Sequence, residues 1–213
     1  MEISLIQNIV YIFSSILFIT GIKMLGKEDT AVKGNFLSAI AMLVAVLVTF
    51  INISNPLILL AGIGLGAFIG SLIALKVKMT SIPEMVALFN GFGGLATFLI
   101  AWSEFNSTPD NLFQYILVMT TVYVGGITFT GSLVAYAKLS EKIQIAKTSI
   151  ITKLFTTIFY ISLAFLLYSA IVTPLLVINF EFFTVLLVLT LLGGIGFVLP
   201  IGGGDMPVVI SLL

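Results

Sequence analysis

One amide and a few hydroxyls are the side chains of this sequence that suit proton or water chemistry in apolar surroundings. Asn90 lies in the apolar run 81–102, SIPEMVALFNGFGGLATFLIAW. At helical spacing this run places small and polar residues on one stripe and bulky residues on the other faces. The stripe consists of Ala87, Asn90, Gly94, Thr97 and Ala101. A second such stripe follows in the run 124–139, VGGITFTGSLVAYAKL, and the residues just before it; it consists of Thr121, Gly125, Thr128, Ser132 and Ala135.

Amide and hydroxyl groups can orient water, but they do not take up a proton near neutral pH. The sequence contains no His and no Cys. Any proton-binding step therefore requires a carboxylate, bound water or a partner chain. We predict a pathway that holds a file of water, lined by Asn90, Thr97, Thr128 and Ser132. The alternative is dry packing, because a hydroxyl in a membrane helix often bonds to its own helix.

The composition identifies the environment of these residues. Hydrophobic residues make up 60% of the chain and charged residues 8%, whereas soluble domains carry about 25% charged residues. The mean hydropathy is +1.25. These values predict an all-α integral membrane protein, a polytopic helix bundle in the lipid bilayer. The formal net charge is zero, which excludes the basic surface that nucleic-acid binding requires.

Seven apolar runs are long enough to cross about 30 Å of hydrocarbon as helices. They are Leu5–Ile22, Gly34–Ile53, Pro56–Leu75, Ile82–Trp102, Leu112–Tyr136, Leu154–Leu176 and Phe180–Ile201. After the glycines of 202–204, the segment 208–213 begins another apolar run. We therefore expect residues 1–213 to form one helical bundle that includes the start of an eighth helix and is cut within it.

The lysines predict the orientation. All nine basic residues are lysines, and they follow the first, third and fifth runs. The opposite side carries acidic residues such as Glu104, Asp110 and Glu181. By the positive-inside rule, the lysine-rich loops lie in the cytoplasm and the N-terminus lies outside, in a plasma (inner) membrane.

Glycines mark the positions where helices are expected to pack closely. Gly62, Gly66 and Gly70 recur at every fourth residue of the third run, which is a pattern of small residues at helix contacts. The run GIGLGAFIG also looks like a dinucleotide-binding loop, but no strand–turn–helix context surrounds it. Gly94 and Gly125 are the corresponding small residues of the two polar stripes.

Three segments together resemble a known family. The runs MTSIPEMVALFNGFGGLA, GGITFTGSLVAYAKLSEKI and GGGDMPVVISLL, in this order, look like the beta subunit of the proton-translocating NAD(P) transhydrogenase. The resemblance extends over essentially the whole chain. It implies hydride transfer between NADH and NADP+ in soluble domains, coupled to proton movement through the membrane helices.

The resemblance also implies partners for this chain. The family's alpha subunit supplies the NAD(H) domain, the beta subunit continues into an NADP(H)-binding domain, and the enzyme works as a dimer of such units. This sequence contains only the membrane-helix portion of the beta subunit. We therefore expect it to bind no cofactor or metal itself and to be inactive in hydride transfer alone.

Two site residues follow from the resemblance. Asp205, in GGGDMP, matches an acidic residue that the family uses to couple proton movement to the NADP(H) domain. Asn90 falls where many members carry an intramembrane histidine proposed to bind the proton, so this sequence departs from the pattern at that position. The alternatives are a small secondary transporter or channel subunit, and a structural membrane anchor for cytoplasmic domains.

Overall fold

The structure, a computed structural model, describes residues 3–53, 55–106, 112–143, 149–172 and 180–213. Its described residues form helices and connecting turns without any strand. The helices are α1 (Ile3–Leu25), α2 (Ala31–Thr49), α3 (Pro56–Lys76), α4 (Ile82–Asn106), α5 (Leu112–Leu139), α6 (Ile150–Val172), α7 (Phe180–Val198) and α8 (Met206–Leu212). By their internal contacts they form two compact units, Met1–Leu75 and Lys76–Leu213, which we describe separately as the first and the second unit.

The prediction of an all-α polytopic bundle is confirmed. Seven of the described helices, α1 to α7, are long and apolar enough to cross a membrane. The short helix α8 begins where the sequence predicted the start of an eighth helix. Helices form throughout because a backbone in hydrocarbon must satisfy its own N–H and C=O groups within the segment.

Some helix boundaries differ from those predicted. Helix α5 continues past Tyr136 to Leu139, so its last turn contains Lys138. Helix α7 ends at Val198 rather than Ile201, since Pro200 has no N–H to donate and disfavours a helical residue before it. The predicted end of the sixth span at Leu176 lies outside the described residues, as do Asp110 and Lys147 of the connecting segments.

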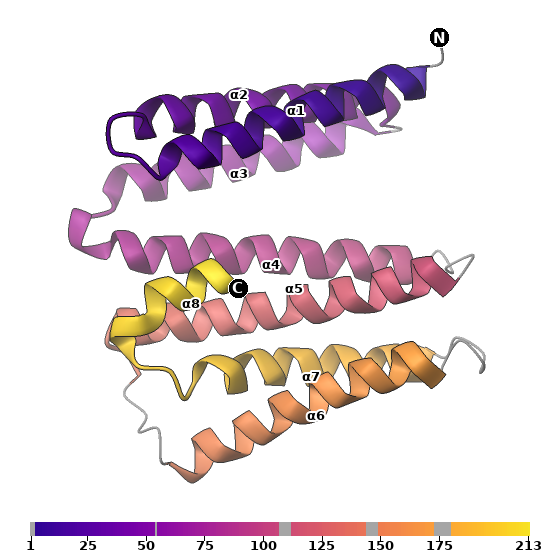
Figure 1. Cartoon of the computed structure of the whole chain (residues 1–213), viewed down its shortest axis with the longest axis vertical. Coiled ribbons are helices and arrows are strands. Elements are labelled where there is room, and N and C mark those ends of the chain that lie inside the picture. The colour runs from indigo at the N-terminus through magenta and orange to yellow at the C-terminus, as the bar shows by residue number, and fades with distance from the viewer. Residues whose placement is uncertain (1–2, 54, 107–111, 144–148, 173–179) are drawn as a thin grey trace. The chain divides into compact units, whose positions relative to one another are not determined.

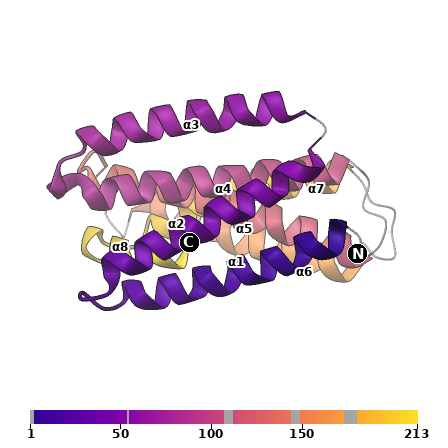
Figure 2. The ribbon, with the colours of Figure 1, turned by 90° about the horizontal axis from the view of Figure 1, so that it is seen from above.

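In the first unit, α1 and α2 run side by side in opposite directions (Figures 1 and 2). They approach closely at Gly34, where an added Cβ would lie 2.6 Å from the carbonyl oxygen of Gly21. At the other end of the pair, the Gln7 side-chain amide donates to the Val48 carbonyl at 3.2 Å. Small residues and polar bonds thus hold this helix pair together, as is common between membrane helices.

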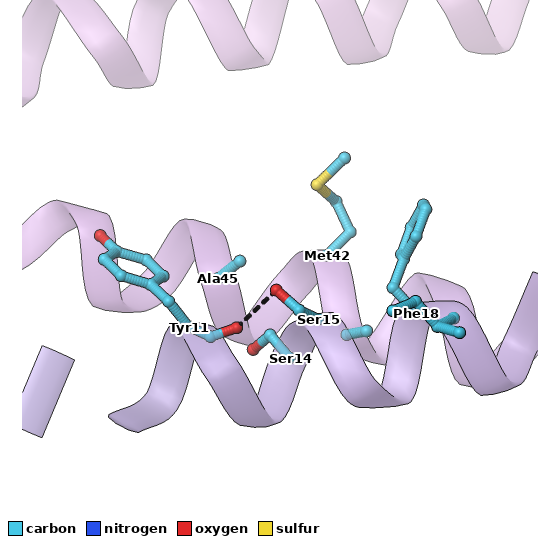
Figure 3. A pocket seen from close by; sticks show the side chains of 8 residues that line it. Tyr11, Ser14, Ser15, Phe18, Met42 and Ala45 are labelled. Carbon is cyan, nitrogen blue, oxygen red and sulfur yellow. Dashed lines mark hydrogen bonds between the residues drawn. The ribbon is translucent and has the colours of Figure 1, made fainter. Parts of the chain in front are cut away.

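A shallow groove of about 340 Å³ opens between α1 and α2 (Figure 3). Tyr11, Phe18 and Met42 project around it from the two helices. The Ser14 hydroxyl at this groove is buried and has no hydrogen-bond partner within the described chain. The Ser15 hydroxyl donates to the carbonyl of Tyr11, in its own helix. The groove is therefore largely apolar, and its serines do not converge on a common point.

The second unit is a series of packed helices in the order α4, α5, α7 and α6, with α8 beside α5 (Figure 1). Helix α5 is the central element, because it packs against α4 on one side and α7 on the other. Glycines on both sides permit this. A Cβ at Gly125 would lie 2.6 Å from the Phe98 backbone nitrogen of α4, and one at Gly126 would collide with the Thr190 hydroxyl of α7.

Two apolar clusters form the core of this unit. The first cluster lies toward the end where α4 finishes and α5 begins, and it contains the stacked pair Phe105 and Phe183, with ring centroids 3.9 Å apart. The second cluster lies toward the other end of α4 and α5. It consists of Ala87, Ala135, Val198, Met206, Val209 and Ile210. Met206, Val209 and Ile210 belong to α8, which is thus anchored in the core.

Candidate functional site

The contact between α4 and α5 is where the structure brings the two predicted polar stripes together. At Gly94, an added Cβ would lie 2.7 Å from both the Phe129 backbone nitrogen and the Thr128 methyl group. The helix backbones therefore touch directly, with no room for a side chain between them. Such contact is typical of membrane helices, where small residues allow backbones to approach.

Asn90 and Ser132 meet across this contact. The Asn90 side-chain nitrogen donates to the Ser132 hydroxyl oxygen at 2.9 Å. Ser132 is completely buried, and Asn90 is half-buried. A Cβ at Gly91 would lie 3.2 Å from the Ser132 Cβ, so the glycine leaves just enough space for the serine side chain. The sequence placed these two residues on facing stripes, and the structure pairs them directly.

The Asn90–Ser132 pair lies between the two apolar clusters of the second unit. Along α4, Asn90 falls between Ala87 of the second cluster and Phe98 of the first; along α5, Ser132 falls between Ala135 and Ile127 in the same way. A polar pair in such surroundings is stabilised by its own hydrogen bond, because unpaired polar groups are costly to bury. The pair is thus enclosed by apolar side chains toward both ends of the helices.

The two threonines of the predicted pathway have different surroundings. Thr128 is buried, and its hydroxyl donates to the main-chain oxygen of Leu213 at 2.7 Å. Thr128 therefore joins α5 to the end of α8. Thr97 is partly exposed, and its hydroxyl donates to the carbonyl of Gly93 in its own helix at 3.0 Å. The structure does not bring Thr97 to the Asn90–Ser132 pair.

Asp205 lies at the surface, apart from the polar pair. It ends the short turn Gly203–Asp205 and stands at the N-cap position of α8, where its side chain makes no capping hydrogen bond. Asp205 is exposed, whereas the neighbouring Met206 is completely buried. The carboxylate is therefore accessible at the start of a helix that is anchored in the core.

The glycines of α3 have no neighbour in the first unit. A Cβ at Gly62, Gly66 or Gly70 would meet no atom within 4 Å, and no described residue of α3 is buried. The spacing of these glycines predicted close helix packing, and the described residues of the first unit do not supply the partner helix. Their role in helix packing stays a prediction.

Lys138 is the residue whose importance sequence reasoning missed. The predicted end of the fifth span at Tyr136 makes Lys138 a loop lysine, whereas in the structure it lies in the last turn of α5 and is half-buried. Its ammonium donates to the carbonyl oxygens of Val198, Leu199 and Ile201 at the end of α7. A lysine in the last turn of an apolar helix was the available signal. The sequence did not indicate that the carbonyls would come from another helix.

Seven membrane-length helices among the described residues, with an amide–hydroxyl pair at the close contact of α4 and α5, define a polytopic helical membrane protein. Within the described residues, His, Cys, Asp and Glu do not gather in threes to form a metal site. The chain matches the family described as NAD(P) transhydrogenase beta subunit over residues 7–213. It therefore belongs to this family.

Two curated relatives are similar to this chain. Both are described as NAD(P) transhydrogenase subunit beta, one from Rhodospirillum rubrum and one from a designated strain of that species. Each is 29% identical over 214 residues, which cover 95% of this chain and 46% of the relative. The chain thus spans about half the length of the relatives that it matches.

Proposed function

We propose that this chain is the membrane part that couples proton translocation to hydride transfer between NADH and NADP+ in a transhydrogenase complex. The observation that carries the proposal is the hydrogen bond of 2.9 Å between Asn90 and Ser132, enclosed between two apolar clusters. Membership of the transhydrogenase beta family supports it. On this proposal the nucleotides bind in soluble domains outside these helices, and the partners are the alpha subunit and the NADP(H)-binding domain, in a dimeric complex.

The chemistry of the pair limits its role. An amide offers two N–H donors and a carbonyl acceptor, and a hydroxyl offers one donor and two acceptor positions. The pair therefore orients water or passes a hydrogen bond along, but neither group takes up a proton near neutral pH. On this proposal the protonatable site comes from a partner chain, with Asn90 and Ser132 lining the path that leads to it.

The direction of the path follows from the lysine distribution. With the lysine-rich loops in the cytoplasm, the turn with Asp205 lies on the cytoplasmic side of a plasma (inner) membrane. The exposed carboxylate is then placed to interact with the NADP(H)-binding domain. Helix α8 connects this turn to the path, since the main-chain oxygen of Leu213 accepts the Thr128 hydroxyl on α5.

The proposal is tested with Asn90→Leu in the complete complex, reconstituted in lipid vesicles. Hydride transfer is followed by nucleotide absorbance, and proton movement by a pH-sensitive dye. We expect Asn90→Leu to abolish proton-coupled turnover, because leucine offers no hydrogen bond to Ser132 or to water. Normal proton pumping by the assembled Asn90→Leu complex would refute the proposal.

Thr97→Val is the matched control. Thr97 lies on the same helix, and its hydroxyl donates to the Gly93 carbonyl of that helix rather than across the contact with α5. We expect this variant to pump protons within about twofold of the unmodified complex. A substitution away from such interhelical contacts changes the free energy of unfolding by only about 0.5 kcal/mol, so the complex should assemble normally. Equal losses in both variants would indicate a general effect of altering α4 rather than a role of the pair.

A further inference from the structure

Lys138 forms a contact between helices that is separate from the residues of the proposed path. Its side chain leaves the last turn of α5 and reaches the end of α7. The ammonium nitrogen lies 3.3 Å from the Val198 carbonyl oxygen, 2.5 Å from that of Leu199 and 2.8 Å from that of Ile201. One ammonium thus donates hydrogen bonds to three main-chain oxygens at and just after the end of α7.

The geometry suits the ammonium group for a physical reason. The last carbonyls of a helix have no partner within it, and they form the negative end of the helix dipole. A lysine ammonium has three N–H donors and no acceptor, so it can satisfy three carbonyls at once. Val198 and Leu199 are buried, which strengthens this charge-assisted contact.

The contact lies immediately before the turn that carries Asp205. Residues 202–205 connect the three carbonyls to α8, whose Met206 is completely buried. At its other end, α8 is joined to α5 through the Thr128 hydroxyl and the Leu213 oxygen. Helix α5 therefore holds α8 before its start, through Lys138, and at its end, through Thr128. Ser132 lies on α5 between these two attachments.

A comparison with Lys142 shows that the contact with α7 belongs to Lys138 and is not made by every lysine near the end of α5. Lys142 lies one turn beyond Lys138 and is exposed. Its ammonium is 3.2 Å from the Tyr136 hydroxyl and 4.9 Å from the centre of the Tyr136 ring. These are local contacts of a surface side chain. Lys142 therefore has the same charge as Lys138 in nearly the same place along the sequence, without the attachment to α7.

We infer that Lys138 is a positioning residue of the coupling machinery: its ammonium fixes the α7–α8 connection, and with it Asp205, relative to the Asn90–Ser132 pair. The inference rests on the proposed function. A displacement of the turn at Asp205 is transmitted to α5 through a short charged contact rather than through a loose loop. Without the ammonium, the three carbonyls lose the hydrogen bonds that it donates, the Val198 carbonyl keeps the N–H donor of Ile201, and the turn separates from α5.

The test compares Lys138→Met with Lys142→Met in the complete complex in vesicles. The measured quantity is the number of protons moved per hydride transferred, together with the rate of hydride transfer. We expect Lys138→Met to lower the proton-to-hydride ratio about tenfold, within the range for residues that carry coupling between sites. Lys142→Met is expected to leave both within twofold of the unmodified complex, since surface substitutions change little.

The outcomes distinguish a role of Lys138 in coupling from a merely structural role, and both from a failure of the proposed function. A merely structural lysine would lower the amount of assembled complex and leave the proton-to-hydride ratio unchanged, and that result overturns the inference. An effect of Lys142→Met as large as that of Lys138→Met overturns it as well. If the unmodified complex transfers hydride without moving protons, the proposed function itself fails, and this is seen before any variant is made.

A chemical rescue keeps the inference testable if Lys138→Met does not assemble. In Lys138→Ala, the missing part of the side chain corresponds to propylammonium. We expect added propylammonium to restore assembly and coupling of Lys138→Ala, while the tetramethylammonium ion, which has no N–H donor, does not. Failure of propylammonium, or equal rescue by both ions, would overturn the binding of the carbonyls by the ammonium.

Discussion

The contact at Gly94 leads to a quantitative prediction for Gly94→Ala. An added Cβ would lie 2.7 Å from the Phe129 backbone nitrogen, whereas ordinary van der Waals contact begins at 3.4 Å. The neighbouring atom is backbone, so α4 and α5 must separate by the difference, about 0.7 Å. The Asn90–Ser132 bond lies one turn away and measures 2.9 Å. The same separation lengthens it to about 3.6 Å, which is no longer a hydrogen bond.

The expected loss of stability follows from this strain. Inserting a methyl group into a close-packed contact costs about 1–3 kcal/mol. For a chain of this length, each kcal/mol lowers the melting temperature by about 2–4 °C. We therefore expect Gly94→Ala to melt several degrees lower in detergent, measured by the exposure of apolar surface to a fluorescent dye. In the complete complex it should also show the reduced proton coupling of Asn90→Leu.

Gly93→Ala provides the control for the prediction on Gly94. Gly93 is adjacent in the sequence, but a Cβ there meets nothing within 4 Å. Alanine is also the better helix former, by about 1 kcal/mol. Gly93→Ala is therefore expected to melt at the same temperature or higher and to keep full coupling. A Gly94→Ala protein as stable and as active as Gly93→Ala would show that the helices are not in the direct contact described.

Two further substitutions test other parts of the chain. We expect Asp205→Asn to slow or uncouple turnover in the complex without changing the melting temperature of the chain, because the exposed carboxylate makes no capping bond; unchanged coupling would remove it from the proposed mechanism. We expect Gly66→Leu to leave the melting temperature of the isolated chain unchanged, because nothing lies within 4 Å of its Cβ position. If this glycine packs against a partner chain, the same variant lowers the yield of complex recovered by affinity purification.

The helices could be predicted from the sequence because the lipid bilayer restricts the conformation of the backbone. Runs of about 20 apolar residues in hydrocarbon have one means of satisfying their backbone, the helix. The seven predicted spans correspond to α1–α7 for this reason. The ends were less predictable, since the carbonyls of the last turn of α5 accept N–H groups from the turn that follows it, which apolar periodicity does not show. Lys138 lies past the predicted end of this helix and contacts the carbonyls at the end of α7.

The polar contacts show why the site was only partly predictable. Thr97 and Thr128 look alike in the sequence, since both lie in stripes of small residues. A threonine in a helix always has a carbonyl of its own helix within reach, and Thr97 uses it. Thr128 instead donates to Leu213, far along the chain, because α8 folds back against α5. Which of the two bonds forms depends on whether another helix comes close enough.

The sequence by itself determined the class of protein, the number of long helices and the stripes on which polar and small residues gather, because composition and periodicity are properties of single segments. Only the tertiary structure decided which stripes meet. Small residues lower the cost of a close approach but do not select the partner helix. Gly94 and Gly125 pack against a neighbouring helix within the second unit, whereas Gly62, Gly66 and Gly70 of α3 meet no described residue of the first unit. The pairing of Asn90 with Ser132 and the reach of Lys138 to α7 follow from that selection.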